Sequence, residues 1–131
     1  MDANEYQYRA LRTCIELYDT KTALVYGALG LAGESGEVAE IIKKWAFHGH
    51  LFNKQELEKE LGDVAWYLAI AAHKAGLSLN EVLEHNLEKL EKRYPDGYSS
   101  ERSVSRDEGT AQEIEFTANG EDYVATQEYL L

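Results

Sequence analysis

The sequence is poor in cysteine, proline and positive charge, and each shortage narrows what the protein can be. A single cysteine, Cys14, excludes an intrachain disulfide and offers no metal-ligand spacing. The 13 lysines and arginines stand against 24 aspartates and glutamates, which gives a net charge of −11 at pH 7. Because binding to a phosphate backbone depends on cationic side chains, this balance argues against a nucleic-acid polymer as partner.

Long apolar runs are also missing. The longest apolar stretch is far shorter than a membrane span, and the first residues lack a basic segment followed by an apolar one. With 131 residues, of which 44% are hydrophobic, the chain is long enough for one domain with its own core. We therefore expect a soluble, cytoplasmic protein with no membrane partner.

Apolar residues recur with the helical period through residues 1–95, and the single proline, Pro95, follows the last periodic stretch. The pattern predicts an all-α domain over 1–95 with four helices, spanning about 4–17, 22–47, 54–75 and 79–94. In the last link Gly76 suits a helix C-terminus, and Ser78 with Glu81 has capping-box spacing. Because short links favour antiparallel neighbours, we expect a four-helix bundle.

Residues 96–131 differ in composition and begin with the polar, serine-rich stretch DGYSSERSVSRDEGTAQ. Asn119-Gly120 lies between two short runs that contain β-forming residues, which predicts a β-hairpin in this C-terminal extension. A two-stranded hairpin is only marginally stable alone, so it would need to dock on the helices or on another subunit. Disorder of the extension is the alternative.

Acidic residues border the apolar faces of the second and third predicted helices. Glu34, Glu37 and Glu40 step from the middle of one apolar stripe to its edge, and Glu60 and Asp63 repeat the three-residue spacing on the next helix. Two antiparallel helices of this kind can bring Glu37, Glu40, Glu60 and Asp63 together at the rim of the core. Because like charges repel, we expect a cation among them. Solvated helix faces are the alternative for any one acid.

Small residues surround these acids in the sequence. They are Gly33, Gly36, Ala39 and Gly62. Glycine lowers helix propensity, so its presence here needs a compensating gain. We expect these positions to allow close approach of the helix backbones.

The type of ligand restricts the metal. The residue three beyond Glu37 is Glu40, and the residue three beyond Glu60 is Asp63, rather than the histidine of a di-iron or di-manganese bundle. Such hard oxygen ligands favour Mg²⁺, with Mn²⁺ as a substitute. Because Mg²⁺ usually completes its octahedron with waters and substrate phosphates, a nucleotide phosphate chain is the expected ligand of the site.

The fourth predicted helix carries complementary groups. Asn86 lies within its apolar stripe, and Lys89 and Arg93 lie on the adjoining strip. Beside a four-acid site such cations suit phosphate recognition, and Asn86 suits a base or sugar edge. The alternatives are a satisfied core amide and cations that favour the helix dipole.

The stretch VAWYLAIAA, residues 64–72, is apolar nearly all the way round, which is typical of a helix covered on every side. A monomer of four helices would hardly cover it. We therefore expect Trp66 and Ile70, which point away from the stripe of Leu57 and Leu61, to be buried in a subunit interface.

Two histidines, His48 and His50, flank Gly49 in the predicted link between the second and third helices. A zinc site needs more nitrogen or sulfur ligands than accompany them. The pattern favours solvated loop histidines.

Three phrases and one signature resemble a known family. Glu37-x-x-Glu40, nineteen residues and Glu60-x-x-Asp63 resemble the E-x-x-E…E-x-x-D signature of the all-α nucleoside triphosphate pyrophosphohydrolases of the MazG type. GLAGESGEVAEIIKK, ELGDVAWYLA and NLEKLEKRYPDGYS are similar to phrases of its short, single-domain members, over most of residues 5–106. The longer signature has a third acid where this chain has Gly36, and Glu34 resembles its replacement in E-x-G-E variants.

The resemblance implies a Mg²⁺-dependent hydrolysis of (deoxy)nucleoside triphosphates between the α and β phosphates, giving a monophosphate and pyrophosphate. It implies metal ligation by Glu37, Glu40, Glu60 and Asp63, with Glu37 or Glu34 as general base, and a homodimer or homotetramer. The expected substrate contacts are Lys44, Trp45, Tyr67, Asn86, Lys89 and Arg93. Two other functions stay open: a phosphoribosyl-ATP pyrophosphohydrolase, and a non-enzymatic helical protein that binds a cation or a basic partner.

Overall fold

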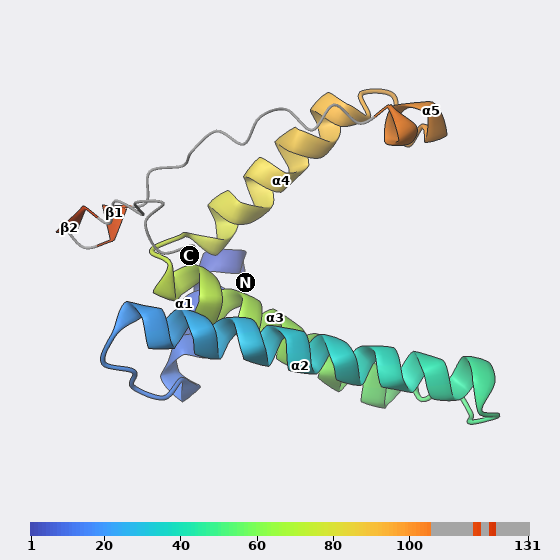
Figure 1. Ribbon diagram of the computed structural model, residues 1–131, viewed down its shortest axis with the longest axis horizontal. Helices are drawn as coiled ribbons and strands as arrows, with labels where there is room; N and C mark the ends of the chain where they lie inside the picture. The colour runs from blue at the N-terminus through green and yellow to red at the C-terminus, as the bar shows by residue number, and fades with distance from the viewer. Residues whose placement is uncertain (106–116, 119–120, 123–131) are drawn as a thin grey trace, which may run out of the picture.

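The computed structural model describes residues 1–105 and two short strands at 117–118 and 121–122. The described part is helical, which confirms the predicted all-α class (Figure 1). Its elements are α1 (Ala3–Ala10), the 3₁₀ turn η1 (Leu11–Thr13), α2 (Thr20–Phe47), α3 (Lys54–Lys74), α4 (Leu79–Arg93), α5 (Ser100–Val104), β1 (Thr117–Ala118) and β2 (Glu121–Asp122).

α2 and α3 lie alongside one another as a long antiparallel helical hairpin (Figure 1). Two glycines of α2 allow the helices to approach. A Cβ added at Gly27 would lie 3.1 Å from the Cβ of Ala71, and one added at Gly30 would lie 2.0 Å from the ring of Tyr67. The close approach is therefore at Gly27 and Gly30.

The glycines near the acids have a different environment from the one predicted. A Cβ added at Gly33, Gly36 or Gly62 would meet nothing within 4 Å among the described residues. The prediction that these three glycines allow close helix packing within the chain is wrong, because they face away from the contact between α2 and α3.

α1 and η1 cover the carboxyl-terminal half of α3 on the face that carries Trp66 and Ile70. The Trp66 indole N–H donates to the Ala10 carbonyl at 3.3 Å and to the Thr13 hydroxyl at 2.9 Å. Ile70 has 0% of its surface exposed within the single chain. The prediction that a subunit interface buries Ile70 is therefore wrong, since the single chain already buries it. Trp66 is partly buried and packs against the core cluster that includes Ala10, and its burial in a subunit interface stays a prediction.

Gln7 connects α1 by hydrogen bonds to the end of α3 and to the turn between α3 and α4. Its side-chain amide donates to the carbonyls of Ala69 and Leu77 at 3.2 and 3.1 Å, and its oxygen accepts from the Leu79 N–H at 3.1 Å. This buried side chain thus satisfies its own hydrogen-bonding groups and three backbone groups. The core of the chain lies at this end, where α1, α3 and the start of α4 meet.

The first helix is shorter than predicted. The apolar period runs to Leu17, but α1 ends at Ala10 and η1 ends at Thr13. The Thr13 hydroxyl donates to the Ala10 carbonyl at 2.9 Å, a local bond that competes with helix propagation. Asp19 then caps α2 by accepting from the Thr22 N–H at 2.8 Å, so α2 begins at Thr20 rather than at Thr22.

The predicted turn between the third and fourth helices is confirmed. Gly76 has a φ of +73°, and the Leu77 N–H donates to the Ala72 carbonyl at 2.8 Å, as in a Schellman cap. Ser78 caps α4 by accepting from the Glu81 N–H at 3.3 Å. α4 then leaves the hairpin, touching α1 and α3 near its start (Figure 1).

The carboxyl-terminal segment adds one short helix that the sequence pattern did not predict. Ser99 caps α5 by accepting from the Arg102 N–H at 3.3 Å. β1 and β2 pair antiparallel, with Thr117 opposite Asp122, in agreement with the predicted hairpin, whose turn residues lie outside the described part. Among the described residues, no helix has both the length and the apolarity that a bilayer crossing requires.

Candidate functional site

Three carboxylates meet between the middle of α2 and the first half of α3. One oxygen each from Glu34, Glu60 and Asp63 lie within 4.8 Å of one another. Glu34 and Glu60 are half-buried, and Asp63 is exposed. Three negative charges this close repel each other, so the arrangement favours a proton or a cation between them.

Neighbouring carboxylates repel the charge of Glu60 in this acid cluster (Glu34, Glu60 and Asp63). Its partial burial raises the pKa of its carboxyl group above the ordinary value, and the charges of Glu34, Asp63, Glu37 and Glu56 raise that pKa further. The protein therefore disfavours the ionised form of Glu60 in the absence of a cation. A bound divalent ion would reverse that preference.

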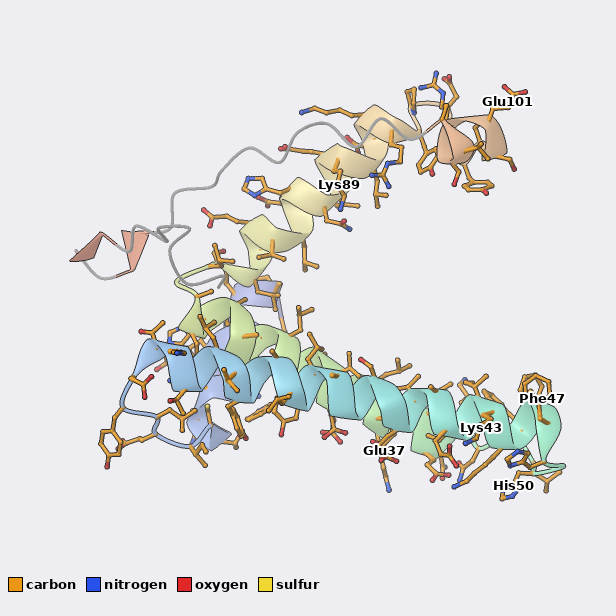
Figure 2. All side chains as sticks on the ribbon, viewed as in Figure 1. Glu37, Lys43, Phe47, His50, Lys89 and Glu101 are labelled. Atoms are coloured by element: carbon orange, nitrogen blue, oxygen red, sulfur yellow. The ribbon has the colours of Figure 1, made fainter. Side chains whose placement is uncertain are left out.

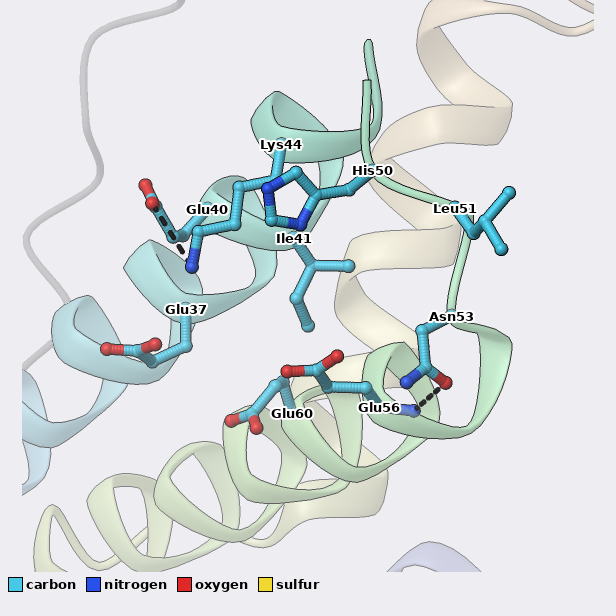
Figure 3. A pocket seen from close by; sticks show the side chains of 9 residues that line it. All are labelled: Glu37, Glu40, Ile41, Lys44, His50, Leu51, Asn53, Glu56 and Glu60. Atoms are coloured by element: carbon cyan, nitrogen blue, oxygen red, sulfur yellow. Dashed lines mark hydrogen bonds and ion pairs between the residues drawn. The ribbon is translucent and has the colours of Figure 1, made fainter. Parts of the chain in front are cut away.

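A pocket of about 130 Å³ lies next to the acid cluster, between the end of α2 and the start of α3 (Figure 3). Glu60 belongs to both the cluster and the pocket, so the two form one continuous site. The lining residues are Glu37, Glu40, Ile41 and Lys44 from α2, His50, Leu51 and Asn53 from the link, and Glu56 and Glu60 from α3.

Glu40 differs from the other acids because it has cationic partners. It forms ion pairs with Lys43 and with Lys44, the latter at 3.5 Å. The hydrogen bond from Lys43 lowers the pKa of the Glu40 carboxyl, and the charges of Lys43 and Lys44 act in the same direction. Glu40 thus remains ionised at the edge of the pocket without a metal.

The two predicted aromatic contacts, Trp45 and Tyr67, are not among the pocket-lining residues. Trp45 packs against Phe52 with ring centroids 5.3 Å apart. The Tyr67 ring lies over Gly30, and its centroid is 5.6 Å from that of Tyr26. Hydrogen bonding to Tyr67, together with burial, raises the pKa of Tyr26 to about 12. Tyr67 therefore packs between the two helices of the hairpin, whereas Trp45 packs against the link.

The predicted substrate contacts of the fourth helix do not meet the acids within one chain. Figure 2 shows Lys89 on α4, well apart from Glu37 on α2. Asn86 and Lys89 are exposed, and the nearest aromatic neighbour of Arg93 is the adjacent Tyr94, 6.0 Å from its guanidinium carbon to the ring centroid. A role for these residues requires α4 of another copy or a movement of α4.

Five pocket-lining residues were not among the predicted site residues: the apolar Ile41 and Leu51, and the polar Glu56, Asn53 and His50. Glu56 lies one helical turn before Glu60, on the same strip of α3, so the spacing of the acids contained a signal for it. Asn53 is the N-cap of α3. A capping pattern can identify such a residue, but it does not show that the side chain also lines a pocket. His50 carried no usable signal, because its position depends on the conformation of the link.

The donor atoms of the site suit a particular class of metal. The acid cluster and the acids that line the pocket offer only carboxylate oxygens. Hard ligands of this kind match Mg²⁺ and Mn²⁺ and are poor ligands for softer ions. The residues present therefore fit a divalent cation of the kind that accompanies phosphate substrates.

Comparisons with known proteins identify a matching family. Residues 26–98 match the model of the MazG nucleotide pyrophosphohydrolase domain. Gene 37 protein of Mycobacterium phage L5 is 39% identical over 79 residues, covering 57% of this chain and 69% of that protein. Uncharacterized protein YvdC of Bacillus subtilis (strain 168) is 32% identical over 92 residues, covering 60% of this chain and 87% of that protein.

No solved structure gave a significant match. The matched residues 26–98 include α3 and most of α2, and therefore the acid cluster and the pocket. Because the family model covers more than half of the chain, the match extends well beyond the short acidic motifs. The chain belongs to the MazG nucleotide pyrophosphohydrolase domain family.

Proposed function

We propose that this protein hydrolyses (deoxy)nucleoside triphosphates between the α and β phosphates, releasing a nucleoside monophosphate and pyrophosphate, with Mg²⁺ as cofactor and Mn²⁺ as a substitute. Membership of the family supports a nucleotide pyrophosphohydrolase activity in general. The observation that carries the finer proposal is the convergence of Glu34, Glu60 and Asp63 beside a pocket that also contains Lys44. Such a site offers ligands for a cation and a donor for phosphate.

The metal would be held by the acid cluster together with Glu37 and Glu40 at the edge of the pocket. A divalent ion in such a site acidifies a bound water and offsets the charge that develops on departing phosphates. Glu34 then has a place among the ligands, in agreement with its position between the helices. Glu37 lines the pocket from α2 and is exposed, so it is available to accept the proton of the attacking water.

A homo-oligomer forms part of the proposal, because large apolar side chains of the hairpin have no cover among the described residues. The side chains of Leu24 and Ile42 on α2 and of Leu61 on α3 are exposed, with Leu61 at 50%. On α4, Leu83, Leu87 and Leu90 are exposed as well. Exposed apolar side chains are candidates for a protein interface, and a second copy of the chain is the partner that we propose.

The same assembly would explain the cations of α4. Lys89 is exposed on a helix that leaves its own hairpin (Figure 2). In a homo-oligomer, α4 of one copy is free to reach the site of another. Asn86, Lys89 and Arg93 therefore remain proposed substrate contacts, now from a neighbouring subunit.

The test is release of pyrophosphate from a panel of ribo- and deoxyribonucleoside triphosphates with Mg²⁺. Glu60→Gln and Asp63→Asn should each lower kcat/KM by at least about a hundredfold, because losing a metal ligand removes several kcal/mol of transition-state stabilisation. Glu58→Gln is the matched control, since Glu58 is exposed on the same helix and lies outside the cluster and the pocket.

Circular dichroism should show that all three variants remain folded. Release of inorganic phosphate in place of pyrophosphate would contradict the proposed bond cleavage. Retention of activity in both Glu60→Gln and Asp63→Asn would contradict the proposed site.

A further inference from the structure

The pocket lining combines carboxylates with N–H donors (Figure 3). The acids are Glu37, Glu40, Glu56 and Glu60, of which Glu60 belongs to the acid cluster. Among the donors, Lys44 and His50 lie together at the end of α2, which we call the donor end, and Asn53 lies beside Glu56 at the start of α3. An ammonium group, an imidazole and a carboxamide all offer N–H donors, the imidazole in either of its charge states. The pocket therefore presents ligands for both a cation and an anion.

The link between α2 and α3 places His50 at the donor end. Gly49 has a φ of +73°, a left-handed conformation that glycine adopts without strain. The chain reverses there, and the N–H groups of His48 and His50 donate to the Lys44 carbonyl at 3.0 and 3.3 Å. His50 is thereby held against the last turn of α2, whereas His48 is not among the pocket-lining residues.

Asn53 is oriented by its role as a helix cap. Its side-chain oxygen accepts from the Glu56 N–H at 3.1 Å. Because only the side-chain oxygen can accept that bond, the other terminal atom of the carboxamide is the amide nitrogen. Figure 3 shows this nitrogen on the side of Glu56 and Glu60. A donor is thus fixed at the pocket by the start of α3.

Lys44 can leave its present partner for a phosphate. Its ion pair with Glu40 spans 3.5 Å, and the side chains of Lys44 and Glu40 are 45% and 37% exposed. Ion pairs as exposed as this contribute little to stability, whereas charge-assisted hydrogen bonds to phosphate are stronger. A phosphate at the donor end would therefore displace Glu40 from Lys44, and Glu40 would become free for the metal.

We infer that the donor end binds the pyrophosphate portion of the substrate, the β and γ phosphates, and that His50 is a substrate-binding residue there. This inference rests on the proposed function. The volume of about 130 Å³ is below that of pockets for whole drug-sized ligands, so the pocket suits part of a nucleotide. The nucleoside is uncharged and would form no ion pair with the Lys44 ammonium group. The departing pyrophosphate carries negative charge and would form one.

The test is calorimetric binding of Mg²⁺-pyrophosphate to the full chain and to loop variants. His50→Ala should weaken this binding about tenfold, the usual effect of losing one hydrogen bond to a charged group. His48→Ala is the matched control, two residues away in the same link, and should bind as the wild type does. His50→Gln keeps a donor and should restore part of the affinity. Binding of a nucleoside monophosphate should be equal in all four proteins.

Several outcomes would overturn the inference. They are equal pyrophosphate affinity in His50→Ala and wild type, an equal loss in His48→Ala, a loss confined to the nucleoside monophosphate, and a wild type that does not bind pyrophosphate. Because binding is measured without turnover, the result is separate from the hydrolysis assay. If the wild type hydrolyses triphosphates while His50→Ala binds pyrophosphate normally, the proposed function stands. Only the proposed binding of pyrophosphate by His50 at the donor end is then refuted.

Discussion

The two ends of the α2–α3 hairpin differ in packing. Every buried residue of the described part lies at the end that α1 covers or on α1 itself: Gln7, Ala10, Ala23, Gly27, Ala69, Ile70, Ala72 and Leu79. At the other end the acids gather, and large apolar side chains such as Trp45, Phe52 and Leu61 are exposed by about half. The first end contains the buried core of the chain, and the second contains the proposed site.

The difference indicates where we propose that the protein binds a cation and a second copy of the chain. The packed end satisfies its polar groups internally, as Gln7 does with its hydrogen bonds to three backbone groups. The acid end combines mutually repelling carboxylates with uncovered leucines. Such local conflicts between sequence and stability are typical of functional sites. A cation would resolve the first conflict, and a second copy of the chain would resolve the other.

The largest effect is expected on subunit association, when a charge is placed among the exposed apolar side chains of the hairpin. Leu61→Asp places a carboxylate on the proposed interface, and burying an unpaired charge costs several kcal/mol. Subunit association should therefore weaken by roughly a hundredfold or more. Sedimentation equilibrium should find the wild type as an oligomer and Leu61→Asp as a folded monomer of 14.8 kDa.

Val104→Asp is the control for this experiment, because Val104 is 89% exposed on α5 and lies away from the hairpin. It should sediment as the wild type does. A monomeric wild type, or a Leu61→Asp variant with unchanged association, would show that the apolar face has some other cover.

A smaller effect is expected from a methyl group at the packed end. Gly30→Ala would put a Cβ 2.0 Å from the Tyr67 ring, so the ring or the helices must move. Overpacking of this kind costs about 1–3 kcal/mol. Chemical denaturation should show that loss of free energy of unfolding.

Gly33→Ala provides the matched comparison, one turn along the same helix. An added Cβ there meets nothing within 4 Å in the described part of the chain, and alanine is the better helix former by about 1 kcal/mol. This variant should be as stable as the wild type or more stable. A destabilised Gly33→Ala would place a second subunit against that surface.

Local signals in the sequence predicted the helices well where capping residues mark the ends. Gly76 and Ser78 identify the turn between α3 and α4 because their roles depend on neighbours a few residues away. The early end of α1 was missed, since the Thr13 hydroxyl competes for a carbonyl and leaves the apolar period unchanged. Patterns of hydrophobicity do not report such competition.

Contacts between distant segments were harder to predict. The apolar stretch of α3 correctly indicated a helix with several covered faces, but not that the single chain would bury Ile70 or that α1 and η1 would bind the indole of Trp66. Helix phase placed Glu34 near the core and Glu60 with Asp63 on one strip, and the structure brings these three together. His50 could not be placed by phase, because a left-handed glycine in the link determines its position.

The smallest effect concerns the repulsion at Glu60. Burial and the neighbouring carboxylates raise the pKa of Glu60 in the folded protein, so the folded chain binds this proton at a higher pH than the unfolded chain does. Without metal, stability should therefore increase as pH falls from neutrality through the raised pKa. Below the ordinary carboxyl pKa both states are protonated, and the penalty is absent.

Glu60→Gln removes that penalty at every pH. The melting temperature of the metal-free variant should exceed that of the wild type by a small margin near neutral pH, and the margin should close on acidification. The pKa of Glu40 is lowered by Lys43 and Lys44, so its contribution is lost at lower pH, but it is the same in both proteins and cancels. Mg²⁺ at neutral pH should close the margin by stabilising the wild type alone. A margin independent of both pH and Mg²⁺ would mean that the two ends of the hairpin do not differ in electrostatic strain.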